Sequence, residues 1–202
     1  MSLKLNSSGG GSITLQEPST ASNRTLTLPD NTGNLISSAD SGTVSQGMLA
    51  SGVAGNGPAF SATRTGGSNI TLSSNTWTKV TFADDRFDTA SCFDPATGRF
   101  TPNVAGYYFF TGRIQYASST TGVSIFNSAL YLNGVSVRTG SAIRFPTGEN
   151  YNPEASNVSG LIYCNGSTDY VELYGWCVGS GTLTMLGGSD LLIFDGFLAR
   201  AA

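Results

Sequence analysis

The sequence predicts an all-β protein, in which a large C-terminal sandwich follows a shorter β module. No long window shows helical periodicity. Short runs of alternating apolar and polar residues recur instead, separated by clusters of Gly, Asn, Pro and Ser. Charged residues make up 11% of the chain, well below the roughly 25% of ordinary soluble domains, while glycine reaches 26 of 202 residues. This composition is typical of strands joined by neutral loops.

The first zone spans residues 1–37, and residues 11–37 within it are predicted to form two or three short strands. Its apolar residues alternate with polar ones and are Ile13, Leu15, Leu26, Leu28 and Leu35. Turn-forming residues lie between them at 30–33. Strands this few and short cannot bury enough surface to fold alone, so we expect other chains to complete them. Residues 38–58 are rich in Ser, Gly and Ala and are predicted to be a flexible linker.

The third zone, residues 59–202, is called the head below. Its strands are expected at 59–65, 69–72, 77–83, 104–117, 126–132, 135–145, 158–164, 169–178 and 190–198. Asn133-Gly134 predicts a tight hairpin, because these residues tolerate the positive φ angles of a type I′ turn. By contrast, Asp84-Asp85-Arg86 is interpreted as a charged turn.

One series of residues in the head resembles the signature of the C1q/TNF-like domain, and consists of Phe82, Asp88, Phe93, Phe100, Gly106, Tyr108 and Phe110. The series departs from that signature at Gly112, where an aromatic residue is expected. The C-terminal stretch from Phe194 to Leu198 also resembles the ending of C1q heads. The resemblance implies a jelly-roll sandwich that assembles as a homotrimer, with the aromatic series in its core. Aromatic residues in excess of one core are expected at the trimer interface, at Tyr107, Phe110, Tyr174, Trp176 and Phe194.

Residues 11–37 resemble a module that recurs in bacteriophage tail-fibre and related virion proteins. The match runs from Gly11-Ser12-Ile13 through Thr25-Leu26-Thr27-Leu28 to Gly33-Asn34-Leu35. The resemblance implies that the N-terminal zone attaches the chain to other virion proteins. No apolar stretch of signal-peptide length follows Met1, so the chain is expected to fold in the host cytoplasm and to end in the virion.

The residues needed for most enzyme chemistry are missing. The chain has no histidine, which removes the usual general base and the commonest zinc ligand. Cys92, Cys164 and Cys177 lack metal-binding spacing and are interpreted as buried free thiols. Paired carboxylates could cleave glycosidic bonds, and the candidates are Asp84/Asp85, Glu149/Glu154, Asp169/Glu172 and Asp190/Asp195. We interpret these pairs as structural, and we predict no catalytic residue, cofactor or metal.

Charge and hydropathy exclude two further classes of partner. The net charge is −3 and the ten Lys and Arg residues are scattered, so no basic stripe exists to bind nucleic acid. No apolar run approaches the ~20 residues that a membrane-spanning helix needs.

The order of the parts predicts a phage fibre protein, whose trimeric head attaches to a glycan or protein of the host surface. Counting strand directions back from the C-terminus places the loops at 117–125, 146–157 and 179–188 farthest from the linker. The receptor-binding residues are therefore expected in these loops, at Thr120, Thr121, Glu149, Asn150, Tyr151 and Asn152. The alternative is a structural capsid-decorating or collar fibre without receptor binding. A cellular C1q-domain protein is a more distant alternative, because collagen repeats are missing.

Overall fold

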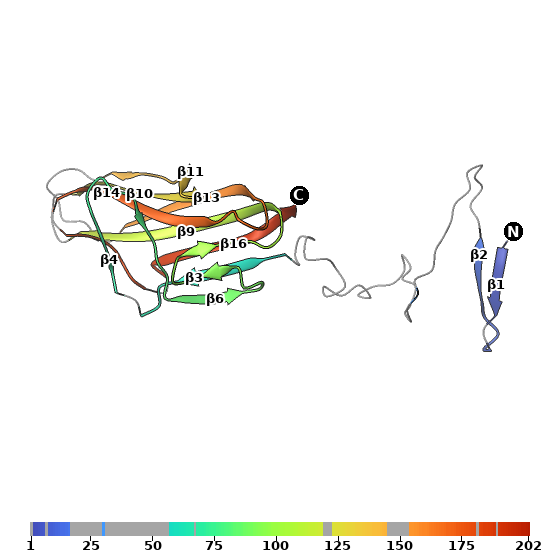
Figure 1. Ribbon diagram of the computed structural model, residues 1–202. Helices are drawn as coiled ribbons and strands as arrows, with labels where there is room; N and C mark the ends of the chain where they lie inside the picture. Colours follow the sequence, from blue (N-terminus) through green and yellow to red (C-terminus); the bar gives the residue numbers. More distant parts are fainter. Residues whose placement is uncertain are drawn as a thin grey trace. The chain divides into compact units, whose positions relative to one another are not determined.

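The computed structural model describes residues 2–6, 8–16, 30, 57–66, 68–118, 123–144, 154–180, 182–188 and 190–202. Every regular element in these residues is a β-strand (Figure 1), as the sequence predicts. Helices long and apolar enough to cross a membrane are therefore absent from the described part of the chain. Contacts divide the chain into two units, Met1–Ser41 and Gly42–Ala202.

The N-terminal unit contains a β-hairpin of strands β1 (Ser2–Asn6) and β2 (Ser12–Gln16). The two strands pair antiparallel along their whole length, from Ser2 opposite Gln16 to Asn6 opposite Ser12. Sequence analysis predicted the second strand but missed the first, although Ser2-Leu3-Lys4-Leu5-Asn6 also alternates polar and apolar residues. The predicted strands around Leu26, Leu28 and Leu35 lie outside the described residues.

The head is a sandwich of two sheets (Figure 1). The first sheet has the order β4-β15-β9-β16-β3-β6, and β13 pairs with the other edge of β9. Its strands are β3 (Ala59–Thr63), β4 (Ile70–Leu72), β6 (Asp84–Asp88), β9 (Gly106–Ser118), β13 (Glu154–Cys164), β15 (Leu183–Met185) and β16 (Leu192–Ala201).

The second sheet has the order β11-β10-β14-β8-β7, with β12 beside β10 and β5 beside β14. Its strands are β5 (Thr78–Lys79), β7 (Phe93–Asp94), β8 (Arg99–Phe100), β10 (Val123–Leu132), β11 (Val135–Thr139), β12 (Ile143–Arg144) and β14 (Val171–Gly179). All nine strands predicted in the head have a counterpart in the two sheets, although several boundaries shift.

One predicted turn is wrong. Asp84-Asp85-Arg86 belongs to β6, which pairs with β3 at the edge of the first sheet. An edge strand has one free side, so it tolerates exposed charged side chains that a central strand would reject. The short strands β7, β8 and β15 were also missed, because two or three residues are too few to show a period.

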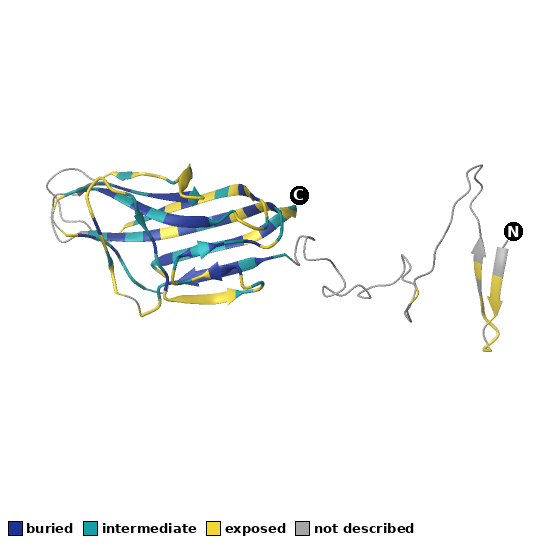
Figure 2. Ribbon diagram, in the orientation of Figure 1, coloured by how far each residue is buried: buried dark blue, intermediate teal, exposed yellow. Residues whose placement is uncertain are grey.

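The core between the sheets confirms the interpretation of the aromatic series. Phe100, Tyr108 and Phe110 are completely buried, and Phe82 and Phe93 nearly so. Phe60 stacks on Phe93 and Phe100, with ring centroids 4.8 and 4.4 Å apart. Figure 2 shows the resulting alternation of buried and exposed residues along the long strands.

Asp88, which belongs to the same series of signature residues, has a structural role. One of its carboxylate oxygens accepts a hydrogen bond from the backbone N–H of Phe93 at 2.7 Å, and the other accepts one from Ala90 at 3.2 Å. The carboxylate therefore shapes the turn that leads from β6 to β7 and places Phe93 in the core.

Gly112 departs from the signature because Leu173 fills its space. A Cβ atom at Gly112 would lie 2.4 Å from Cδ1 of Leu173, which is a fully buried residue of the opposite sheet. A larger side chain at position 112 would therefore collide with Leu173 of β14.

Strand register fixes the two ends of the sandwich. Gly106 pairs with Cys164 and Ala201, so the start of β9 and the C-terminus share one end, called the base. The predicted Asn133-Gly134 hairpin is present and lies at the base, because β10 ends there. Both residues have positive φ angles, of 53° and 79°. The opposite end, called the apex, contains Ser118, Val123, Arg144 and Glu154.

Candidate interaction surface

The outer side of the first sheet carries a cluster of exposed apolar side chains near the base. Its members are Tyr107, Phe109, Leu161, Tyr163 and Phe197, with exposed fractions of 44, 38, 48, 45 and 50%. These five residues are called the apolar face. They are not scattered, because Phe109 pairs with both Leu161 and Phe197, and Tyr107 pairs with Tyr163. A contiguous apolar patch on an antiparallel sheet normally marks an interaction site.

The rings of the apolar face also contact one another. Tyr107 and Tyr163 have centroids 5.5 Å apart, and Phe109 and Phe197 have centroids 5.9 Å apart. Strand alternation positions them, since the neighbouring residues Tyr108, Phe110 and Leu198 point into the core. The side chains therefore form a continuous surface on three adjacent strands.

Of the five residues predicted at the trimer interface, Tyr107 is the one that lies on the apolar face. Phe110 and Phe194 do not, because both are completely buried in the core of a single chain and have no surface to offer a partner. Their assignment to an interface is therefore wrong, and exposed aromatic side chains of the same strands, β9 and β16, are Phe109 and Phe197. Sequence analysis missed Phe109, Leu161, Tyr163 and Phe197, although two-residue periodicity in β9, β13 and β16 contains the necessary signal.

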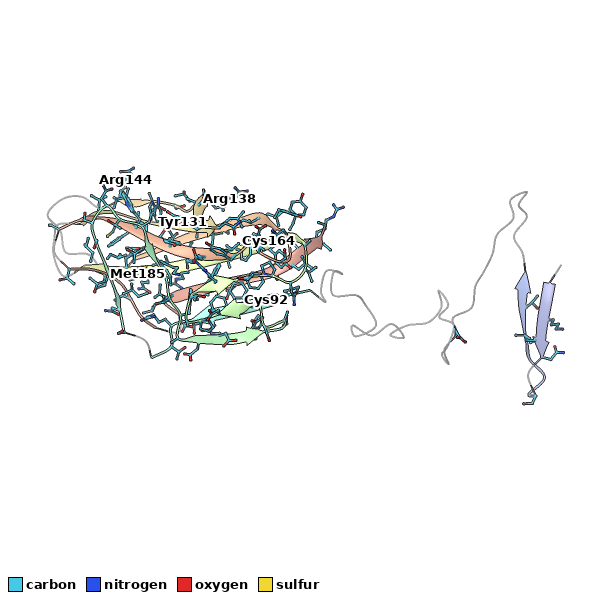
Figure 3. The ribbon with its side chains drawn as sticks, in the orientation of Figure 1. Cys92, Tyr131, Arg138, Arg144, Cys164 and Met185 are labelled. Carbon is cyan, nitrogen blue, oxygen red and sulfur yellow. The ribbon has the colours of Figure 1, made fainter. Side chains whose placement is uncertain are left out.

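Tyr174 and Trp176 lie on the outer side of the second sheet, away from the apolar face. Trp176 stacks on Trp77 with centroids 6.0 Å apart, and Tyr174 stacks on Tyr131 at 4.0 Å. Both residues are half-buried in this small aromatic cluster. Figure 3 labels Tyr131 on this side of the sandwich.

Three of the candidate carboxylates, Glu172, Asp169 and Asp190, have structural partners. Glu172 is buried and pairs with Lys79 and Arg99. Asp169 accepts hydrogen bonds from the Asn165 backbone N–H and from Asn133 Nδ2, both at 2.8 Å, and so joins two turns at the base. Asp190 pairs with Arg86 at 2.9 Å. Asp84 and Asp85 are exposed on β6, Glu154 is exposed on β13, and Glu149 lies outside the described residues.

The three cysteines are free and buried, as the sequence predicts. Burial raises the pKa of Cys164 to about 12 and that of Cys177 to about 11, and it also raises the pKa of Cys92. These thiols are therefore poor nucleophiles. Figure 3 shows Cys92 and Cys164 within the sandwich. The part of the chain that the structure describes contains no cluster of metal-binding side chains.

The predicted receptor-binding residues Thr120, Thr121, Glu149, Asn150, Tyr151 and Asn152 lie outside the described residues. The strand ends that flank them are at the apex, where Glu154 pairs with Tyr116 and Ser118 ends β9. Their receptor role stays a prediction.

Comparison with known proteins agrees with the architecture. The family model for the C1q domain matches residues 59–144. A tumour necrosis factor structure, Eiger TNF from S. frugiperda, has 12% sequence identity and a TM-score of 0.54, covering 71% of this chain and 93% of its own.

The head has the C1q/TNF-like fold. The globular domain of the zebrafish complement 1qA protein also matches the C1q-like head, with 19% identity and a TM-score of 0.49, covering 72% of this chain and 99% of its own. No curated protein matches the sequence.

Proposed function

We propose that the chain forms a homotrimer through the apolar face of its C1q-like head. The observation that supports this proposal is the exposure of five large apolar side chains on adjacent strands. Each is about half-exposed in a single chain, so burial in an interface would contribute on the order of 1 kcal/mol per side chain. Three-fold symmetry lets every copy cover the same patch, which closes the assembly.

Light scattering on the full-length chain tests the trimer. The native protein should have three times the chain mass of 20.9 kDa. Replacing Phe109 and Phe197 together by Asp should yield single chains that retain the β-sheet circular dichroism spectrum, because both side chains point away from the core. Val135→Asp is the matched control, since Val135 is exposed but lies at the base hairpin. A single-chain mass for the native protein would refute the proposal.

The trimer is proposed to serve as a bacteriophage fibre that attaches to the host surface. The resemblance of residues 11–37 to a tail-fibre module supports attachment of the N-terminal unit to the virion, and the C1q-like head then displays its apex. Weak binding at each of three copies gives high overall avidity when several fibres bind one cell. Surface glycans fit the neutral Ser, Thr, Asn and Tyr residues of the apical segments.

The segment 145–153, between β12 and β13, is the proposed receptor site, and Tyr151 and Asn152 are its proposed contact residues. Replacing both residues by Ala should abolish adsorption of the particle to host cells, while light scattering still reports a folded trimer. Val135→Ser at the base is the control, and it should leave adsorption unchanged. Normal adsorption of the Tyr151/Asn152 variant would move the site elsewhere on the head.

A capsid-decorating or collar fibre without receptor binding is the second candidate, because the same trimer and the same N-terminal unit would serve it. Electron microscopy of particles labelled with antibody against the head distinguishes the two. Label at the tail, together with antibody inhibition of adsorption, supports attachment. Label on the capsid, with adsorption unaffected, supports the structural role.

A further inference from the structure

Asp195, Thr111 and Ser159 lie side by side on β16, β9 and β13, next to the apolar face, and are called the polar row. This row contains an unsatisfied carboxylate. Asp195 on β16 is half-buried, and its Oδ1 is the one buried side-chain oxygen or nitrogen without a hydrogen-bond partner among the described residues. Asp195 lies on the outer side of the sheet, because its neighbours Phe194 and Gly196 face the core. A carboxylate with one oxygen removed from water and without a partner costs free energy. A cation outside the chain can reach this carboxylate through its other oxygen, Oδ2, which is not among the buried atoms without a partner.

An unpaired cation lies on the same surface. Arg113 on β9 is exposed, and its guanidinium makes no ion pair or hydrogen bond within the described part of the chain. In the sheet register Arg113 is opposite Ile193, while Asp195 is opposite Thr111. The two charged residues are thus diagonal neighbours on adjacent strands that do not form an ion pair within one chain.

We propose that Arg113 of one protomer pairs with Asp195 of the neighbouring protomer. This inference rests on the proposed trimer. The apolar face crosses β16, β9 and β13, and the residues of the polar row continue on the same three strands. When the apolar faces of the copies meet, the next rows meet as well.

Other cations are less suitable partners for Asp195. Arg200 lies at the far side of the apolar face, because it pairs with Tyr107 and the Phe109–Phe197 row separates it from Asp195. Ser61 and Thr111, which lie directly beside Asp195 on the neighbouring strands, are uncharged. One Arg113–Asp195 pair at each of three interfaces would be shielded from water by the apolar face. Such pairs chiefly define which surfaces meet and in which register.

Charge reversal in the full-length chain tests the pair. Arg113→Asp and Asp195→Arg each place like charges together, so each variant should give the mass of one chain at a concentration where the native protein gives three. Combining both changes in one chain should restore the three-chain mass. Arg144→Asp is the matched control, because Arg144 is an exposed arginine of the second sheet and should not matter.

Mixing the two single variants shows whether the pair joins different chains. In a mixed trimer, two of the three interfaces would bring opposite charges together, so the mixture should regain a three-chain mass. A pair within one chain would be restored only in the combined variant and never in the mixture. That result, or single variants that remain trimers, would overturn the inference while leaving the trimer intact. If the native protein itself gives the mass of one chain, the proposed trimer is refuted.

Discussion

Arg99 Nε donates a hydrogen bond to Glu172 Oε1 at 2.9 Å, which joins β8 to β14 on the outer side of the second sheet. Lys79 Nζ reaches the same oxygen at 3.3 Å, and the Tyr174 hydroxyl donates to Oε2 at 3.3 Å. The guanidinium of Arg99 also lies 4.1 Å from the ring centroid of Tyr170. The carboxylate is buried, whereas both cations retain contact with water.

Because the Glu172 carboxylate is buried and its two cations are not, removing the cations should destabilise the protein more than removing the carboxylate. Replacing Lys79 and Arg99 together by Met strands a buried carboxylate and should lower the free energy of unfolding by about 3 kcal/mol. Glu172→Gln should cost less, about 1–2 kcal/mol, because the released cations can turn to solvent. Urea denaturation at one fixed protein concentration measures both variants. Equal losses would contradict the asymmetry.

A second prediction concerns a polar bridge between the sheets. Ser128 of β10 and Ser156 of β13 are buried, and their hydroxyl oxygens lie 2.8 Å apart. Ser156 Oγ donates to the Ser141 carbonyl at 3.0 Å, so Ser128 is the donor within the pair. Ser156→Ala should cost about 1–3 kcal/mol, because the buried Ser128 hydroxyl and the Ser141 carbonyl lose their partner.

A double-mutant cycle isolates the bridge. Ser128→Ala combined with Ser156→Ala should cost clearly less than the sum of the single changes, since the second change removes a group already left unsatisfied. Additive losses in thermal and urea unfolding would show that the two hydroxyls do not interact.

Gly112 provides a third prediction. Gly112→Ala should destabilise the head by about 1–3 kcal/mol, because the new methyl group would overlap Leu173. Gly112→Ala combined with Leu173→Val should recover part of this loss, since the shorter side chain vacates space. The control is Leu173→Val alone, which should be destabilising through the cavity it leaves. No recovery in the combined variant would mean that the backbone, not Leu173, limits this position.

Alkaline pH gives a fourth prediction. The folded pKa values of Cys177 and Cys164, about 11 and about 12, exceed the ordinary thiol value of 9.0. The folded state therefore holds protons that the unfolded state releases above pH 9. Stability should be unaffected by these thiols below pH 9, and should fall between pH 9 and 11 by up to roughly 1.4 kcal/mol per pH unit for each thiol.

Removing both thiols tests whether they cause the loss of stability at alkaline pH. The Cys164→Ala/Cys177→Ala variant is less stable at neutral pH because of its cavities, but its stability should decrease less steeply between pH 9 and 11. Urea midpoints at several pH values measure the slope, and the range from pH 6 to 8 serves as the internal reference. Identical slopes above pH 9 in both proteins would assign the alkaline loss to tyrosines.

The sequence alone determined the strand content, the base hairpin and the inward-facing aromatic series. These features are local: two-residue alternation marks a strand, and Asn133-Gly134 supplies the turn geometry by itself. The signature residues Phe93, Phe100, Tyr108 and Phe110 were predicted to be buried, and all of them are. Short edge strands such as β6 escaped detection, since pairing with β3 rather than local preference makes them strands.

Only the tertiary structure decided which side of each strand faces solvent and what it meets there. Phe109 and Phe110 are equally apolar and adjacent, yet one is exposed and the other buried, because the register of β9 between β13 and β16 sets the direction of each side chain. The contact that Leu173 of the opposite sheet makes at Gly112 has the same origin. Both depend on contacts between residues far apart in the chain: alternation marks the two faces of a strand, and the neighbouring strands decide which face is buried.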